Sequence, residues 1–219
     1  MWQKEGIRKL YSRWASIYDI AHHLQTIWRD TKYRNIVANI VDIQPGERVL
    51  DVSTGTGLTG LTALVKQPNA YIIGIDLTPA MLYQAQENIK KNSAEERFGI
   101  VIGDMENLPF VNNSFDVIIS TLGIGGIEDR DKAFAEIVRV AKPSARIAAV
   151  EMVSPPLEKK LKRRIHKYLV ESWVKRFWGF SDIDLEGLFE KDGIDIEKTE
   201  YYDEFFLGSS KLVYAVVRK

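Results

Sequence analysis

The sequence contains no cysteine among its 219 residues, which excludes disulfide bonds, thiolate catalysis and cysteine-ligated zinc or iron–sulfur sites. It also lacks an apolar run of about 20 residues, the length that a membrane-spanning helix needs. The N-terminal MWQKEGIRKL has no apolar core of the kind found in signal peptides. We therefore expect a cytoplasmic protein without a membrane-spanning segment.

The formal net charge of the chain is zero, because 30 basic residues balance 30 acidic residues. Without a global positive field, nucleic acid could bind only through a local basic patch, so we expect no nucleic-acid partner. The histidines do not suggest a metal site either. His22 and His23 are adjacent and point to different sides of a helix, and His166 is remote in the sequence.

From Arg48 onward, short apolar segments alternate with segments of helical periodicity. The expected strands are Arg48–Ser53, Ala70–Asp76, Gly99–Asp104, Phe115–Leu122 and Ala145–Met152. The expected helices are Gly57–Lys66, Pro79–Lys91 and Asp131–Ala141. Apolar strands connected through helices are typical of a parallel sheet that is covered on both faces. The pattern therefore predicts an α/β protein with a Rossmann-like, mostly parallel sheet.

The C-terminal region follows a different pattern. Two strand-like segments, IDIEKTEYYDE and KLVYAVVRK, are separated only by FFLGSS. A connection of this length suits an antiparallel hairpin and is too short for a helical crossover. We therefore expect a seven-stranded sheet whose last strand is antiparallel.

Two helical segments lie outside the strand–helix alternation. In Met1–Ile43, apolar residues recur at steps of three and four, as in an amphipathic helix. In Leu157–Phe180 they recur every four residues, and the stretch EKKLKRRIHKYLVESWVKR is basic. We expect a single domain, residues 1–219, with a helical cap formed by residues 1–43 and 154–182. The basic stretch predicts either a lid with solvated lysines or peripheral contact with an anionic membrane.

The segment DVSTGTGLTG follows the first expected strand and contains Gly55-x-Gly57-x-x-Gly60. This spacing alone fits a nicotinamide nucleotide or another nucleotide. Acidic residues end three successive expected strands, and these residues are Asp51, Asp76 and Asp104. So many carboxylates disfavour a pyrophosphate, whereas S-adenosylmethionine (SAM) carries a sulfonium, an ammonium, two ribose hydroxyls and an adenine amine. Since one carboxylate can accept both ribose hydroxyls, the charge pattern favours SAM.

Four segments in order carry a family resemblance: VLDVSTGTGLTG, YIIGIDLTPAML, VIGDMENLPF and NSFDVIISTLGI. Over about Glu47–Met152 they resemble the successive motifs of class I SAM-dependent methyltransferases. Within that superfamily the chain is most similar to the ubiquinone/menaquinone C-methyltransferase group. YSRWASIYDIAHHL near the N-terminus is also similar to small bacterial phospholipid N-methyltransferases. The resemblance implies SAM as the cofactor and S-adenosylhomocysteine as the product.

The resemblance also implies roles for individual residues. Asp51 would orient the glycine loop or the ammonium of SAM, and Asp76 would hold the ribose. Asp104 would accept the adenine amine, while Tyr11 and Tyr18 would close over the cofactor. The other implied cofactor-binding residues are Gly55, Thr56, Gly57 and Thr121 at the methionine part, Leu77 and Met105 at the adenine, and Met81.

Two positions depart from the family pattern. Ser53 replaces the usual first glycine of the loop, and KPSA at Lys142–Ala145 replaces a KPGG turn. The sequence names no catalytic base. Glu151 ends the fifth expected strand, where it would either touch the substrate or be solvated.

For the methyl acceptor we expect a small or lipid-like molecule, such as a quinone precursor or a phospholipid amine. Aromatic residues of the expected cap would shelter it, and these are Trp14, Tyr18, Trp28, Trp173, Phe177 and Trp178. Two alternatives stay open at this point. One is a nicotinamide-dependent oxidoreductase, and the other is a non-catalytic SAM-binding protein.

Overall fold

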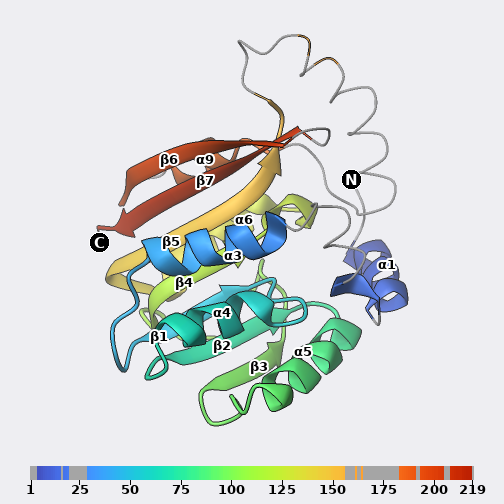
Figure 1. Cartoon of the computed structure of the whole chain (residues 1–219). Coiled ribbons are helices and arrows are strands. Elements are labelled where there is room, and N and C mark those ends of the chain that lie inside the picture. Colours follow the sequence, from blue (N-terminus) through green and yellow to red (C-terminus); the bar gives the residue numbers. More distant parts are fainter. Residues whose placement is uncertain are drawn as a thin grey trace.

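The strands of the computed structural model form one sheet in the order β3-β2-β1-β4-β5-β7-β6 (Figure 1). The structure describes residues 4–15, 17–19, 29–155, 161, 164, 183–190, 193–204 and 208–218. The strands are β1 (Arg48–Val52), β2 (Tyr71–Asp76), β3 (Phe98–Ile102), β4 (Phe115–Thr121), β5 (Ala141–Val153), β6 (Ile194–Glu204) and β7 (Gly208–Val217). The apolar composition of the central strands β1 and β4 fits their position, because helices cover both faces of the sheet.

Strands β1 to β5 run parallel to one another, while β7 is antiparallel to both β5 and β6. The predicted seven-stranded sheet with an antiparallel last strand is therefore confirmed. The chain order reverses at β1, whose neighbours are β2 on one side and β4 on the other. Open sheets of this kind bind ligands beyond the carboxyl ends of the strands at that point.

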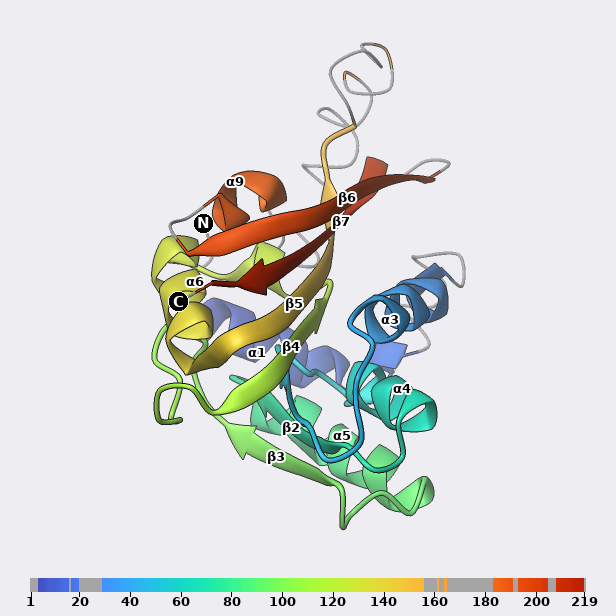
Figure 2. The same ribbon diagram turned by 90° about the vertical axis from the view of Figure 1, so that its left-hand side faces the viewer.

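Helices cover both faces, as predicted. Helices α3 (Arg29–Ile40), α4 (Leu58–Lys66) and α5 (Pro79–Lys91) lie on one face, and α6 (Arg130–Val140) and α9 (Leu185–Phe189) lie on the other (Figure 2). Each face is closed by its own cluster of buried apolar side chains. Leu61 and Leu64 of α4 enter one cluster, and Phe134 and Ile137 of α6 enter the other.

The N-terminal region divides into two helices with different surroundings. Helix α1 (Lys4–Trp14) lies beyond the carboxyl ends of the parallel strands and contacts α5 (Figure 1). Helix α3 instead packs on α4 and β4, with Tyr33 and Val37 fully buried. Helix α3 therefore belongs to the core, while the expectation of a helical cap over residues 1–43 stays a prediction. Periodicity could not separate the two cases, because a helix shows an apolar face in either place.

Two other expectations concern β5 and the segment that follows it. The strand begins at Ala141, so the KPSA segment lies inside it as a bulge between the pairs Phe115↔Ala141 and Val117↔Arg146. Ser144 in this bulge has a φ of 65°. Residues 154–182, the second segment of the expected cap, lie largely outside the described residues.

Candidate functional site

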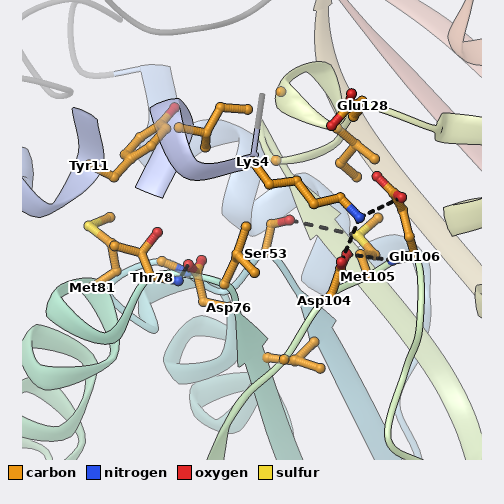
Figure 3. A pocket seen from close by; sticks show the side chains of 18 of the residues that line it. Lys4, Tyr11, Ser53, Asp76, Thr78, Met81, Asp104, Met105, Glu106 and Glu128 are labelled. Carbon is orange, nitrogen blue, oxygen red and sulfur yellow. Dashed lines mark hydrogen bonds and ion pairs between the residues drawn. The ribbon is translucent and has the colours of Figure 1, made fainter. Parts of the chain in front are cut away.

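A cleft lies beyond the carboxyl ends of β1, β2 and β3, and α1 passes across it (Figure 3). Lys4, Ile7 and Tyr11 of α1 line the cleft, because residues three and four apart share one face of a helix. The empty space of the cleft, with its open mouth included, is about 810 Å³.

Asp51 holds the glycine loop from inside the protein. Its Oδ2 accepts hydrogen bonds from Thr54 Oγ1 at 2.6 Å and from the Gly60 N–H at 3.0 Å. Burial raises the pKa of this carboxyl to about 7, although the two hydrogen bonds lower it. Gly57, the N-cap of α4, has a φ of 80°, a left-handed conformation that favours glycine. Asp51 therefore orients the loop without lining the cleft.

Asp76 ends β2, and its side chain lines the cleft (Figure 3). Its Oδ2 accepts the Gly55 N–H at 2.9 Å and its Oδ1 accepts the Thr78 N–H at 2.8 Å. Loss of hydration raises the pKa of Asp76, although the N–H donors of Thr78 and Gly55 lower it. Because each carboxylate oxygen can accept a second hydrogen bond, Asp76 can bind a ligand hydroxyl while it ties the glycine loop to α5.

Lys4 ties α1 to the segment after β3. Its ammonium lies 2.6 Å from Asp104 Oδ2 and 2.6 Å from Glu106 Oε2 (Figure 3). Hydrogen bonds to these two carboxylates raise the pKa of Lys4. Asp104 Oδ1 accepts the Glu106 N–H at 2.9 Å, so both of its oxygens already have one partner. One cation and two anions therefore meet at this end of the cleft.

Tyr11 and Tyr18 both line the cleft, with ring centroids 5.8 Å apart and planes inclined at 55°. Burial raises the pKa of both phenols, and the negative charge of Asp76 raises it further. Both side chains are therefore neutral at physiological pH and can donate hydrogen bonds. Next to them, Thr56 Oγ1 donates to Asp19 Oδ1 at 2.7 Å, which joins the glycine loop to the segment after α1.

The turn after β4 packs directly on the loop after β1. A β-carbon added to Gly123 would lie 2.4 Å from the β-carbon of Ser53. Ser53 and Leu122 have φ values of 53° and 56°, a conformation that costs a non-glycine residue of order 1–3 kcal/mol and persists only where the surroundings enforce it. The serine that replaces the usual glycine thus adopts a left-handed conformation.

The cleft brings together most of the residues expected to bind the cofactor. Those that line it are Tyr11, Tyr18, Gly55, Asp76, Leu77, Met81, Asp104 and Met105. Asp51, Thr56, Gly57 and Thr121 do not line it. Asp51, Thr56 and Gly57 shape the glycine loop. Thr121 ends β4 with its hydroxyl buried and without a hydrogen-bond partner among the described residues.

Several residues of the cleft are not expected from the sequence. They are Lys4, Ile7, Ser53, Ile75, Thr78, Gly103, Glu106, Leu122, Gly123, Gly126, Ile127 and Glu128. The helical spacing from Tyr11 back to Ile7 and Lys4 could have found the first two. No local signal identifies Glu106, whose partner Lys4 is 102 residues away along the chain.

Glu151 contradicts one of the two expectations for it, namely that its side chain is solvated. It is not solvated, since its exposed fraction is 0%. Its Oε1 accepts the N–H of Ile124 at 2.6 Å, so the turn after β4 covers it. Sequence could not reveal this cover, because the turn and the strand end are 27 residues apart along the chain.

The groups of the cleft fit SAM better than a pyrophosphate nucleotide. Asp76 and Asp104 offer acceptors for hydroxyl and amine donors, and the buried Met81 and Met105 offer apolar contacts for a flat ring. Among the described residues that line the cleft, Lys4 is the only basic side chain, and it is paired with two carboxylates. A pyrophosphate would therefore meet negative charge without a free cation.

Comparisons with known proteins agree with this fit. Residues 43–198 match a family model described as "Methyltransferase domain". The demethylmenaquinone methyltransferase of Thermotoga maritima is 32% identical over 172 residues, which are 78% of this chain and 72% of that protein. The ubiquinone/menaquinone biosynthesis C-methyltransferase UbiE of Citrifermentans bemidjiense is 32% identical over 154 residues, which are 70% of this chain and 66% of that protein.

Solved structures share the fold. The geranyl diphosphate methyltransferase in complex with GPP and sinefungin gives a TM-score of 0.71 at 11% identity, over 85% of this chain and 77% of that one. A SAM-dependent methyltransferase of Aquifex aeolicus gives a TM-score of 0.59 at 21% identity, over 84% of this chain and 89% of that one. The chain belongs to the methyltransferase-domain family, and it is a class I SAM-dependent methyltransferase. The choice between SAM and a nicotinamide nucleotide is thereby decided for SAM.

Part of the expected cap lies beyond the described part of the chain. The aromatic residues Trp28, Trp173, Phe177 and Trp178 lie outside the described residues, as do the three histidines. The basic stretch of residues 158–176 also lies outside them, except for Leu161 and Arg164. Within the residues that the structure describes, no helix is long and apolar enough to cross a membrane. The same residues contain no group of acidic side chains arranged to hold a metal ion.

Proposed function

We propose that this enzyme transfers the methyl group of SAM to a ring carbon of a quinone precursor in its reduced, quinol form. The observation that carries the proposal is the 32% identity, over 78% of the chain, to a demethylmenaquinone methyltransferase. When bound, SAM supplies a methyl group on a positively charged sulfur, which is already a strong electrophile. The protein then has mainly to align the acceptor and exclude water.

For the cofactor, we infer that Asp76 binds the ribose hydroxyls and that Asp104 accepts the adenine amine. Leu77 and Met105 would pack on the adenine, in keeping with their place in the cleft. Tyr11 and Tyr18 would cover the methionine end from the side of α1. Asp51, Thr56 and Gly57 act on this arrangement indirectly, by fixing the glycine loop.

The described walls of the cleft suit an uncharged acceptor. Ile7 and Ile127 add apolar surface to the rings of Tyr11 and Tyr18. Glu128 adds negative charge at the same cleft, and the described part offers no unpaired cation there. This arrangement supports a quinol over a phospholipid amine, whose phosphate would be repelled, and it disfavours nucleic acid for the same reason.

The quinol form matters because of its electronic structure. A ring carbon next to an ionised hydroxyl is nucleophilic, whereas the same carbon in an oxidised quinone is not. The acceptor must therefore lose a proton, and one base in the site would assist that step. The proposal predicts turnover only when the acceptor is kept reduced.

Transfer of a tritiated methyl group tests the proposal. The purified protein is incubated with labelled SAM and one of three acceptors: a short-chain demethylnaphthoquinol under reducing conditions, the same compound oxidised, or phosphatidylethanolamine vesicles. We expect label in the reduced naphthoquinol alone. Label in the phospholipid would contradict the proposed acceptor, and so would the absence of label from the quinol when calorimetry shows that SAM binds.

A further inference from the structure

The carboxyl group of Glu151 is buried in a position that is unfavourable for a charged group. None of it is exposed to solvent. Its Oε1 accepts the N–H of Ile124 at 2.6 Å, and the N–H groups of Gly123 and Gly125 also stabilise its charge. Its Oε2 is buried without a hydrogen-bond partner among the described residues. A carboxylate placed this way loses its hydration, and the hydrogen bonds that it accepts replace only part of the lost free energy. This cost indicates that the carboxylate has a role other than stabilising the fold.

The turn that Glu151 contacts is part of the wall of the cofactor cleft. Gly123 and Gly126 line the cleft, and Ile124–Gly126 forms a short 3-10 helix, η1. A segment so rich in glycine loses much conformational entropy when it is ordered. Arg130 Nη2 donates to the carbonyl oxygen of Gly125 at 2.9 Å. Glu151 and Arg130 therefore fix the turn together, one through its N–H groups and the other through a carbonyl.

Fixing this turn also fixes the loop after β1. Gly123 abuts Ser53 so closely that no β-carbon fits between them. Ser53 and Leu122 flank this contact, and both have a positive φ. Strained residues need surroundings that hold them. Glu151, Arg130 and the Gly123–Ser53 contact supply such surroundings at the edge of the cleft.

We propose that Glu151 is a positioning residue for SAM: its ionised carboxylate holds the turn of residues 123–126 against Ser53, and its protonation loosens this wall and weakens SAM binding. Burial raises the pKa of Glu151 to about 7, so the change falls near neutral pH. The N–H donors of Ile124, Gly123 and Gly125 oppose that rise.

The charged and titratable groups around Glu151 come from several elements. Arg130 on α6 lowers the pKa of Glu151, and the charge of Glu151 raises the pKa of Tyr11 on α1. Lys211 is its register partner on β7, and this lysine forms an ion pair with Glu186 of α9. Arg130 and Lys211 are cationic well above neutral pH and Tyr11 is neutral there. Near neutral pH the group that changes charge at this place is therefore Glu151 itself.

The variant Glu151→Gln provides the test, because glutamine has the shape of the acid but does not ionise. The dissociation constant for SAM is measured by calorimetry at about pH 8 and about pH 6. We expect wild type to bind roughly tenfold more weakly at the lower pH. The variant should bind SAM more weakly than wild type at about pH 8 and equal it near pH 6. Equal affinities of the two proteins at the higher pH would overturn the proposal.

Two comparisons keep this test specific. Asp51, whose pKa also lies at about 7, titrates in both proteins, so the difference between them isolates Glu151. Asp116→Asn is the matched control, because Asp116 also accepts a backbone N–H, from Arg48, but lies near the opposite end of β4. We expect this control to bind SAM as wild type does. A loss of affinity of equal size in the control would contradict the proposal.

The ligand comparison separates positioning from direct charge attraction. If Glu151 acts through the turn, its substitution weakens SAM and the neutral product S-adenosylhomocysteine alike. A loss confined to the sulfonium ligand would assign a direct charge effect and overturn the positioning role.

Wild-type protein offers a second readout if the variant fails to fold. By linkage, the labelled carboxyl carbon of Glu151 should titrate at a lower pH with S-adenosylhomocysteine bound, and an unchanged midpoint would contradict the proposal.

Discussion

The ammonium of Lys4 on α1 lies 2.6 Å from Oδ2 of Asp104, in the segment after β3. The same carboxylate is the one that we propose for the adenine amine. Lys4 also contacts Glu106 at 2.6 Å, and Glu106 is almost fully buried. The ion pair therefore fastens α1 across the cleft at the point where the adenine would lie.

Lys4→Met removes this fastening charge but keeps the apolar stem. The pair is partly exposed and contributes about 1 kcal/mol or less, so we expect SAM to dissociate up to about fivefold faster in a stopped-flow experiment. Lys9→Met is the control, because Lys9 pairs with Glu5 of the same helix and both are largely exposed. High salt should speed dissociation from wild type but not from Lys4→Met. Equal rates for wild type and Lys4→Met would contradict this role.

Asp76→Ala tests the proposed ribose contact. The substitution removes a charged acceptor and also frees the N–H groups of Gly55 and Thr78, which the carboxylate now holds. We expect SAM affinity, measured by calorimetry, to fall by about 1.5–3 kcal/mol. Asp76→Asn should lose less, since an amide oxygen can still accept one hydrogen bond. An Asp76→Ala variant with wild-type affinity would show that the ribose lies elsewhere.

The contact between Gly123 and Ser53 predicts that a second substitution, at Ser53, restores the SAM binding that a substitution at Gly123 weakens. Gly123→Ala places a β-carbon 2.4 Å from that of Ser53, so we expect SAM binding at least about tenfold weaker. Ser53→Gly removes the opposing β-carbon and suits the φ of 53°, and the double variant should recover most of the affinity. Gly99→Ala is the control, since nothing lies within 4 Å of its added β-carbon. Additive losses in the double variant would rule out this contact as the cause.

Glu151 should also reduce the stability of the protein at high pH. Its pKa is raised from 4.5 to about 7 in the folded state, so the unfolded chain loses the proton first. The contribution of Glu151 therefore lowers the stability of the protein as pH rises through this window, by about 3 kcal/mol. Glu151→Gln should be more stable than wild type at about pH 8, and the difference should shrink toward about pH 5. Urea unfolding at both pH values measures this, and a variant less stable than wild type at the higher pH would refute it.

Much of this architecture could be predicted because the signals are local. The apolar strands, the helices between them and the short C-terminal hairpin each lie in one stretch of chain. Asp76 and the glycine loop are recognisable for the same reason, since their positions at strand ends place them at the cleft. On the strength of the sequence alone, three strand-end carboxylates favour SAM, and these are Asp51, Asp76 and Asp104.

The parts that sequence did not reveal depend on contacts between distant segments. Asp51 has the same strand-end position as Asp76, yet its carboxylate turns inward to Thr54 and Gly60. Lys4 becomes part of the site only because α1 crosses the cleft. Glu151 is covered by a turn that belongs to a different strand end. In each case the direction of a side chain, and not its place in the sequence, decides its role.

The most direct test of the account is the structure of the protein crystallised with S-adenosylhomocysteine. We predict the nucleoside in the cleft beneath α1, with its ribose hydroxyls hydrogen-bonded to the Asp76 carboxylate and its adenine amine at Asp104. A nucleoside bound outside this cleft, or a ribose that makes no contact with Asp76, would contradict the account.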